Sequence, residues 1–561
     1  MTQAHPDIHG QGIGARLPRK EDRRFLHGQG QYVGDIRMPG MLEVAFVRSP
    51  LAHARVRGIE KPAGFEHLVY GMRDLNGVKP ILAASGLPGF RRSVQYPLAY
   101  DKVRFAGEMV AMCVAPTRAQ AEDLAEQVYV DYEELPAVVD MHEAAEGRSP
   151  EILHDGWDRN VFLETLVDKP AASAPADAVK VARRLQTSRQ CMVPLEGRGV
   201  LCWWDTRLDQ LVMISAAQMP HINRAGLAEC LGLDQGQIRV ISPDVGGGFG
   251  YKGLLLPEEV CCAWLAIRLR RPVRWLEDRR EHLGANANCR EHAYDIAVQV
   301  DRSGRLIAIE CDAIVDSGAY SSYPFSACLE AAQVGSILPG PYRMDGFTCR
   351  TRSAATNKPP ILPYRGVART GVCFALEVML DLAARELGIE PYELRERSLV
   401  RAEDMPYTNI TGKLFDSGDY AACMRRAVDG LGWAQWRARQ AQHHLPVLIA
   451  QLPLQPPHPG AAERIERGAA QHLALGERLQ HRPHPRAERD LLRAPGGPQH
   501  RRVQAVAQLL PPGHLDGELR LERRIGEQAR DLVLVLVRGE LVQPVRDGLG
   551  ERGAQPESLL G

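Results

Sequence analysis

A change of composition at Trp436 limits how much of this chain can build an ordinary hydrophobic core. The 561-residue sequence has 7 Trp, 15 Tyr and 11 Phe, and every one of them lies at or before Trp436. From Arg437 to Gly561 there is also no Met, Cys, Lys, Asn or Thr. Because aromatic side chains supply much of a core's burial energy, we expect the packed fold to lie within residues 1–436.

Two interpretations of residues 437–561 stay open. Their bias towards Arg, Leu, Pro, Gly, Gln, Ala, Glu and His fits a disordered low-complexity tail. The other interpretation, which we favour, is translation of a GC-rich gene out of frame. The apolar run at 532–537 could form one strand, but a lone strand has nothing to pair with. On either interpretation we expect an aberrant tail without a function of its own.

Charge and cysteine usage exclude several classes of protein. Lys+Arg and Asp+Glu both number 69, so the chain lacks the basic excess of a nucleic-acid or anionic-membrane binder. No apolar run reaches the roughly 18 residues of a membrane span, and the start of the chain lacks the apolar segment of a secretory signal. The 12 cysteines form no CxxC pair, which fits a reduced compartment. We expect a cytoplasmic protein.

Strand and helix patterns alternate within the first 436 residues. Apolar periodicity, a Thr117 cap, a turn at 301–304 and Gly388 as a helix end are the signals. They predict strands at 110–114 and 129–132, a helix at 118–128, a hairpin at 294–314 and a helix at 376–387. This interleaving indicates a mixed α/β (α+β) architecture.

A glycine cluster, Gly246-Gly247-Gly248-Phe249-Gly250, follows the predicted strand near Val240. Consecutive glycines allow positive φ and let backbone N–H groups approach an anionic ligand closely. The spacing fits neither a P-loop nor the dinucleotide fingerprint, because no Gly-Lys-Ser/Thr and no immediate helix follow. A ligand cradle and an ordinary glycine-rich turn are equally open here.

Two further positions are candidates for ligand contact. Gln218 lies between a predicted strand and a predicted helix, where it could donate a hydrogen bond to a cofactor oxygen, although such residues are more often satisfied within a loop. Arg365 lies just ahead of a predicted helix and suits an oxyanion, or a structural pair with a carboxylate. A protein-ligated zinc site is not expected, because metal-ligand spacing is missing at His221, His282 and His292.

Residues 13–436 contain a series of short motifs. No single motif is specific to one protein family, but the set in this order is. They lie at 19–22, 25–36, 48–55, 103–108, 131–139, 195–200, 218, 246–250, 316–320, 364–366, 386–391 and 416–420. In this order they resemble the molybdenum-cofactor-binding large subunit of the xanthine dehydrogenase/aldehyde oxidase family. The resemblance implies a leader segment (1–25), an α/β-hammerhead domain (26–145), the first half of the cofactor-binding region (146–436) and the aberrant tail (437–561).

The resemblance also implies a cofactor and its contacts. Family members bind molybdenum–molybdopterin, which in bacteria is often the cytosine dinucleotide. Gln218 would hydrogen-bond an oxo group of the metal, and Phe249 and Gly250 would approach the metal's ligands. Gly247 and Gly248 would belong to the same cradle, and Arg365 to a loop beside the active site.

By the same resemblance, the chain would oxidise its substrate with oxygen from water and pass electrons onward. Iron–sulfur and FAD centres need cysteine clusters or domains that this sequence lacks. The resemblance therefore implies a small 2Fe-2S subunit and an FAD-binding subunit as partners, in a heterotrimer that could itself form a dimer.

Departures from the family pattern narrow the range of substrates that we expect. Gly366 occupies the position where carbon-monoxide dehydrogenases carry Cys, and Gly253 the position where purine oxidisers carry Glu. Ala368 and Thr370 replace the second Gly and the Pro of the usual Arg-Gly-x-Gly-Arg-Pro loop. Carbon monoxide and xanthine are thereby disfavoured, which leaves an aldehyde or an N-heterocycle.

The family's glutamate base is not found in this sequence. It belongs to a second cofactor-binding half, in a Gly-x-Gly-Glu element followed by small residues. Only Gly548-Leu549-Gly550-Glu551 has that spacing, and Arg552 follows it. No catalytic residue is assigned, and we expect the chain as written to be inactive. The alternative is a non-catalytic scaffold relative that keeps the subunit-docking domains.

Overall fold

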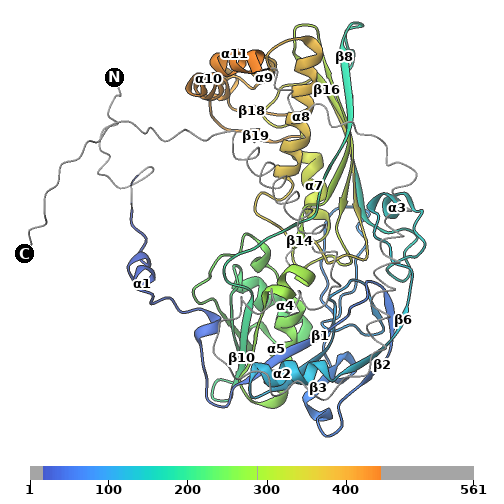
Figure 1. Cartoon of the computed structure of the whole chain (residues 1–561), viewed down its shortest axis with the longest axis vertical. Coiled ribbons are helices and arrows are strands. Elements are labelled where there is room, and N and C mark those ends of the chain that lie inside the picture. The colour runs from blue at the N-terminus through green and yellow to red at the C-terminus, as the bar shows by residue number, and fades with distance from the viewer. Residues whose placement is uncertain (1–14, 16, 287, 444–561) are drawn as a thin grey trace, which may run out of the picture. The chain divides into compact units, whose positions relative to one another are not determined.

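The computed structural model describes residues 15, 17–286 and 288–443 (Figure 1). The predictions for the strand at 532–537, for Glu551 and for the tail beyond residue 443 therefore lie outside the described residues. Within them, helices and strands alternate along the chain, which confirms the mixed α/β prediction. None of the helices in this described part is both long and apolar enough to cross a membrane.

A seven-stranded sheet joins segments that are far apart in the sequence. Its order is β12 (Ile238–Ile241), β11 (Gln210–Ser215), β10 (Gly199–Asp205), β13 (Val273–Leu276), β1 (Leu42–Arg48), β5 (Met109–Ala115) and β3 (Val69–Gly71). The junction is the parallel pairing of β1 with β13, in which Leu42 lies opposite Val273. Strands from the region matched to the hammerhead pattern thus share one sheet with strands that follow residue 145.

Three helices cover this sheet, and the burial that they cause accounts for the apolar residues of its strands. They are α2 (Arg118–Glu126), α4 (Pro220–Leu231) and α5 (Pro257–Leu269). The predicted cap of α2 is confirmed, because the Thr117 hydroxyl accepts the N–H of Gln120. β5 is buried along its whole length, which accounts for its unbroken apolar run. In α5, Cys261 and Cys262 are buried core residues.

A second sheet of five strands carries the predicted hairpin. Its order is β7 (Val161–Lys169), β17 (Gly346–Ala354), β16 (Leu306–Asp316), β15 (His292–Val300) and β8 (Val179–Thr187). Gly304 closes the turn between β15 and β16 with φ +82°. Two helices, α7 (Cys328–Ile337) and α8 (Arg369–Leu387), pack on one face of this sheet (Figure 1).

Helix α8 starts seven residues before the predicted helix. Its first turns escape an apolar-spacing analysis because they contain Gly371 and the exposed Phe374. A Cβ on Gly371 would lie 2.5 Å from the Tyr294 hydroxyl, so this glycine lets the helix approach β15 closely. The predicted end is confirmed, since Gly388 follows the helix with φ +68°.

Smaller elements complete the described chain. They are α1 (Asp22–Leu26), β2 (Ala54–Glu60), β4 (Lys102–Val103), β6 (Tyr129–Glu134), α3 (Met141–Glu146), β9 (Gln190–Cys191), α6 (Arg279–Glu281), β14 (Asn288–Cys289), α9 (Pro391–Ser398), β18 (Tyr407–Thr408), β19 (Leu414–Phe415), α10 (Tyr420–Leu431) and α11 (Trp433–His443). β4, β2 and β6 form a three-stranded sheet, and α10 packs on α9 and α11 (Figure 1).

Candidate cofactor site

The glycine cluster forms a loop of unusual backbone geometry, separated from the end of β12 by residues 242–245. Gly247 and Gly250 have φ +95° and +124°, and Phe249 has φ +52°. A Cβ on Gly248 would lie 2.5 Å from the Gln218 side-chain oxygen, and one on Gly250 would collide with the Pro363 carbonyl. Glycine is therefore required both by conformation and by close approach. We call residues 246–250 the glycine loop.

Gln218 is oriented by the glycine loop. It lies between β11 and α4, and its Oε1 accepts the N–H of Gly250 at 3.0 Å. Because a backbone N–H can only donate, this contact identifies the amide oxygen and turns Nε2 away from Gly250. The structure shows no acceptor for Nε2 among residues 15, 17–286 and 288–443. The two N–H donors of Gln218 Nε2 therefore have no partner within this described part of the chain.

Arg365 is brought to the same place through its backbone. Its N–H donates to the Phe249 carbonyl at 2.6 Å, and the neighbouring Tyr364 ring stacks on the Phe249 ring at 5.7 Å between centroids. Arg290 supports this loop by donating to the Arg365 carbonyl at 2.8 Å. The Arg365 side chain is exposed, and within the described part of the chain it has no carboxylate partner, so the structural-pair alternative finds no support there.

All six predicted site residues therefore meet at one place. The strand end at Gln218, the loop after β12 and the segment ahead of α8 contribute amide donors, closely approached backbone and a guanidinium. Such a set suits an anionic ligand bearing oxygen acceptors. The six residues are Gln218, Gly247, Gly248, Phe249, Gly250 and Arg365.

Two residues that the sequence analysis did not assign to the site hold the glycine loop from behind. Glu196 accepts the N–H of Gly246 at 2.7 Å and the Lys252 ammonium at 2.9 Å. Burial lowers the pKa of Lys252 even though Glu196 opposes that shift. The partners are about 50 residues apart in the sequence, so no local pattern connects them.

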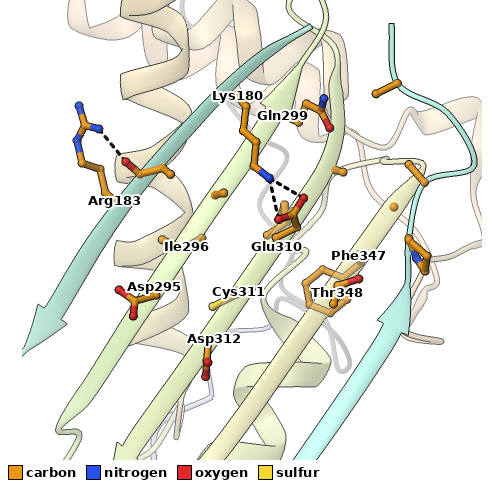
Figure 2. A pocket seen from close by; sticks show the side chains of 18 of the residues that line it. Lys180, Arg183, Asp295, Ile296, Gln299, Glu310, Cys311, Asp312, Phe347 and Thr348 are labelled. Atoms are coloured by element: carbon orange, nitrogen blue, oxygen red, sulfur yellow. Dashed lines mark hydrogen bonds and ion pairs between the residues drawn. The ribbon is translucent and has the colours of Figure 1, made fainter. Parts of the chain in front are cut away.

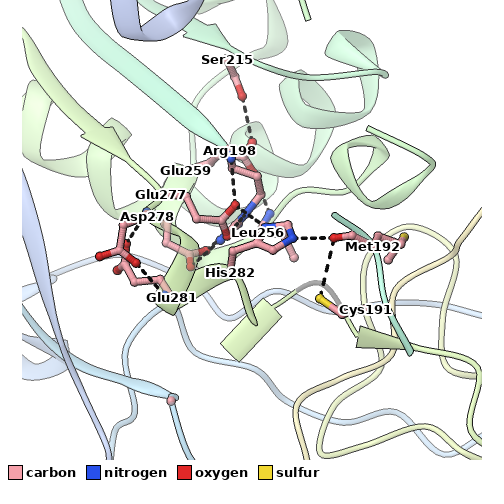
Figure 3. A network of polar contacts seen from close by, with 12 residues as sticks. Cys191, Met192, Arg198, Ser215, Leu256, Glu259, Glu277, Asp278, Glu281 and His282 are labelled. Carbon is pink, nitrogen blue, oxygen red and sulfur yellow. Dashed lines mark hydrogen bonds and ion pairs between the residues drawn. The ribbon is translucent and has the colours of Figure 1, made fainter. Parts of the chain in front are cut away.

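Glu259 fixes the strand end that leads to Gln218. Its Oε1 accepts from the Ser215 hydroxyl at 3.0 Å and from the Asn223 amide at 3.1 Å, and its Oε2 accepts the N–H of Leu256 at 2.7 Å (Figure 3). One carboxyl group thereby connects β11, α4 and the start of α5. Burial raises the pKa of Glu259 to about 7.

A large cavity among the described residues lies elsewhere. It has a volume of about 910 Å³ and lies on the five-stranded sheet, mainly on the face opposite α8 (Figure 2). Its charged side chains pair with each other or with close neighbours, as in Lys180–Glu310 at 2.8 Å and Arg184–Asp295 at 2.7 Å. The residues that line it include none of the six candidates. Its volume therefore does not identify the site.

Replacing Gly250 with alanine should disrupt the loop. Gly250→Ala forces an L-residue into φ +124° and drives a Cβ into the Pro363 carbonyl. We expect a loss of about 2 kcal/mol or more in the free energy of unfolding, measured by urea denaturation. Gly253→Ala is the matched control, because its Cβ would meet only the flexible Met219 sulfur, at 3.2 Å. Equal effects of the two substitutions would contradict this account.

Glu259 should make stability depend on pH. Its pKa is about 7 in the folded chain against an ordinary 4.5, so the folded state holds a proton that the unfolded state has released. This contribution is complete below about pH 4.5 and lost by about pH 7, and it is worth up to about 3 kcal/mol. Glu259→Gln should flatten this part of the stability–pH curve, whereas Glu229→Gln, at an exposed position of α4, should not. An unchanged slope in Glu259→Gln would refute the assignment.

Comparisons with known proteins find two family models that match consecutive parts of this chain. The family model "Aldehyde oxidase and xanthine dehydrogenase, a/b hammerhead domain" matches residues 27–136. The family model "Molybdopterin cofactor-binding domain" matches residues 153–399.

Individual related proteins match about three quarters of this chain. The chain is 34% identical to the nicotine 6-hydroxylase large subunit of Paenarthrobacter nicotinovorans, over 74% of this chain and 51% of that protein. It is 32% identical to the carbon monoxide dehydrogenase large chain of Hydrogenophaga pseudoflava, over 77% and 55%. The solved quinoline 2-oxidoreductase of Pseudomonas putida 86 superposes with a TM-score of 0.72 at 35% identity, over 76% and 55%.

The chain thus spans about half the length of these relatives. Both matched domains fall within the described residues, in hammerhead-then-cofactor order, and the six candidate residues lie within the matched cofactor-binding domain. This chain belongs to the aldehyde oxidase and xanthine dehydrogenase family of molybdopterin-dependent oxidoreductases.

Proposed function

We propose that residues 26–436 are the hammerhead and first cofactor-binding region of a molybdenum hydroxylase large subunit, which oxidises an aldehyde or an N-heterocycle with oxygen from water. The convergence of Gln218, the glycine loop and Arg365 is the observation that supports this most. The names of two relatives, nicotine 6-hydroxylase and quinoline 2-oxidoreductase, favour an N-heterocycle.

The residues present fit a molybdopterin cofactor, whose phosphate and dithiolene groups are anionic. When bound, the molybdenum centre supplies Lewis acidity and a two-electron acceptor. Gln218 would help to hold this cofactor with its Nε2 hydrogens, which the orientation imposed by Gly250 keeps available. The glycine loop would let the backbone approach the cofactor, and Arg365 would offer positive charge to its anionic groups.

The substrate preference rests on two glycines. Gly253 has no side chain, so this position offers no carboxylate to bind a purine. A Cβ at this position would lie 3.2 Å from the Met219 sulfur. Gly366 has φ +93° and no thiol. We therefore propose a substrate other than xanthine or carbon monoxide.

The remaining parts of the proposal concern partners and completeness. We propose a cytoplasmic heterotrimer with a 2Fe-2S subunit and an FAD-binding subunit, and the cytosine dinucleotide as the cofactor form. We also propose that residues 437–561 are out of frame, so that the chain as written lacks its glutamate base and does not turn over. A non-catalytic scaffold is the alternative.

Sequencing the gene across the codons for residues 435–445 tests the frame directly. We expect an inserted or deleted base whose correction restores aromatic residues and a terminal Gly-Glu element. The reason is the complete loss of aromatic residues after Trp436. An intact frame would refute this part and would make the chain a genuine, inactive relative.

Molybdenum content tests the cofactor assignment. The frame-corrected chain, co-expressed with its partner subunits in a host that makes the cofactor, should contain roughly one molybdenum per chain, as a catalytic metal requires. Gln218→Ala should lower this content several-fold. Gln210→Ala is the matched control at the other end of β11, where the side chain bonds only the Gly236 carbonyl. Metal-free wild-type protein would favour the scaffold.

A further inference from the structure

A buried histidine lies between the two segments that form the back of the candidate site. His282 is fully buried at the start of a single π-helical turn, His282–Asn286. Its Nδ1 lies 3.0 Å from Glu277 Oε2, and its Nε2 lies 2.5 Å from the Met192 carbonyl oxygen (Figure 3). Short π-helical turns occur frequently at functional sites.

The contacts of His282 determine where its protons are. The Met192 carbonyl can only accept, so Nε2 carries a hydrogen. Glu277 accepts from Arg198 at both oxygens, from the backbone N–H at 2.8 Å and from Nε at 3.1 Å, so this side chain is a carboxylate that also only accepts. Burial would raise the pKa of Glu277, but Arg198 counters burial and the pKa is lowered to about 2. Both ring nitrogens therefore donate, and His282 is an imidazolium.

The charges around His282 suit that cation. Glu277 faces Nδ1, the Tyr251 ring meets the imidazole edge-on at 5.5 Å, and Glu281 precedes it in the chain. Beyond Glu277, the Arg198 guanidinium donates two hydrogen bonds to Glu258 at 2.8 and 3.0 Å and one to Glu277 at 3.1 Å. Arg48 donates to Glu258 and Glu281. Three cations thus meet three carboxylates.

His282 touches both segments that fix the glycine loop. Met192 begins the segment 192–197, in which Pro194 packs against Gly247 and Glu196 binds the N–H of Gly246. Tyr251, under the imidazole, directly follows Gly250. The imidazolium therefore connects the supporting segment to the end of the glycine loop, and the side chains of His282 and Glu277 are both fully buried.

We propose that His282 is a positioning residue of the cofactor site, which as an imidazolium clamps segment 192–197 through the Met192 carbonyl and so sets the place of the glycine loop. The nature of the ligand rests on the proposed function, whereas the clamp itself does not. Without a donor at the place of Nε2, the Met192 carbonyl loses this hydrogen bond and the clamp weakens.

Hydrogen–deuterium exchange of the cofactor-free full chain tests the clamp. In His282→Gln, amides of 192–197 and 246–252 should exchange about tenfold faster, the size expected for the loss of one charge-assisted hydrogen bond, while β10 stays unchanged. His154→Gln is the matched control: His154 is also buried and bonds one carbonyl, that of Ala319, but burial, with Arg104 nearby, lowers its pKa to about 3 and keeps it neutral. It should leave both peptides unaffected. Unchanged exchange of 192–197 in His282→Gln, or equally faster exchange of β10, would overturn the proposal.

Molybdenum content of wild type and His282→Gln, measured in the frame-corrected chain co-expressed with its partner subunits, separates the clamp from the function. Faster exchange together with reduced molybdenum in His282→Gln supports both. Faster exchange in a chain whose wild type never binds molybdenum supports the clamp and refutes the proposed function. Faster exchange with wild-type molybdenum content would overturn the claim that the clamp positions the cofactor site.

Discussion

The hydrogen bond from Gly250 to Gln218 is the contact on which the rest of the site depends. It requires the backbone to come so close that Gly248 and Gly250 have no room for a Cβ. It also determines which end of the Gln218 amide faces outward. The bond joins the loop after β12 to the end of β11, and the Arg365 backbone then joins both to the segment ahead of α8.

Holding that geometry requires charges to be buried around the loop. A buried ion pair contributes little net stability, because desolvation offsets most of its attraction. The pairs of Glu196 with Lys252 and of Arg198 with Glu258 are therefore better explained by placement than by stability. Each fixes one backbone segment relative to another, and removing one partner would leave an uncompensated buried charge.

Local signals and the order of motifs predicted a large part of this structure. The Thr117 cap, the hairpin turn and the Gly388 helix end are short-range features, and the structure has each of them. The pairings of Glu196 with Lys252 and of Glu277 with His282 were not predictable. Each pair depends on side chains that become neighbours only when the folded chain buries them. The parallel pairing of β1 with β13 is likewise invisible to periodicity, since over 200 residues separate Leu42 from Val273.

Side-chain donors without a partner within the described residues identify the candidate site better than cavity volume does. The cavity on the five-stranded sheet is large, but Lys180 and Glu310 already satisfy each other there (Figure 2). At the glycine loop, by contrast, the hydrogen bond from Gly250 orients the Gln218 amide and backbone bonds place Arg365, while the Gln218 Nε2 and the Arg365 guanidinium have no partner within the described residues. A folded chain keeps such donors oriented at the cost of strained backbone, and a ligand that accepts from them accounts for both features.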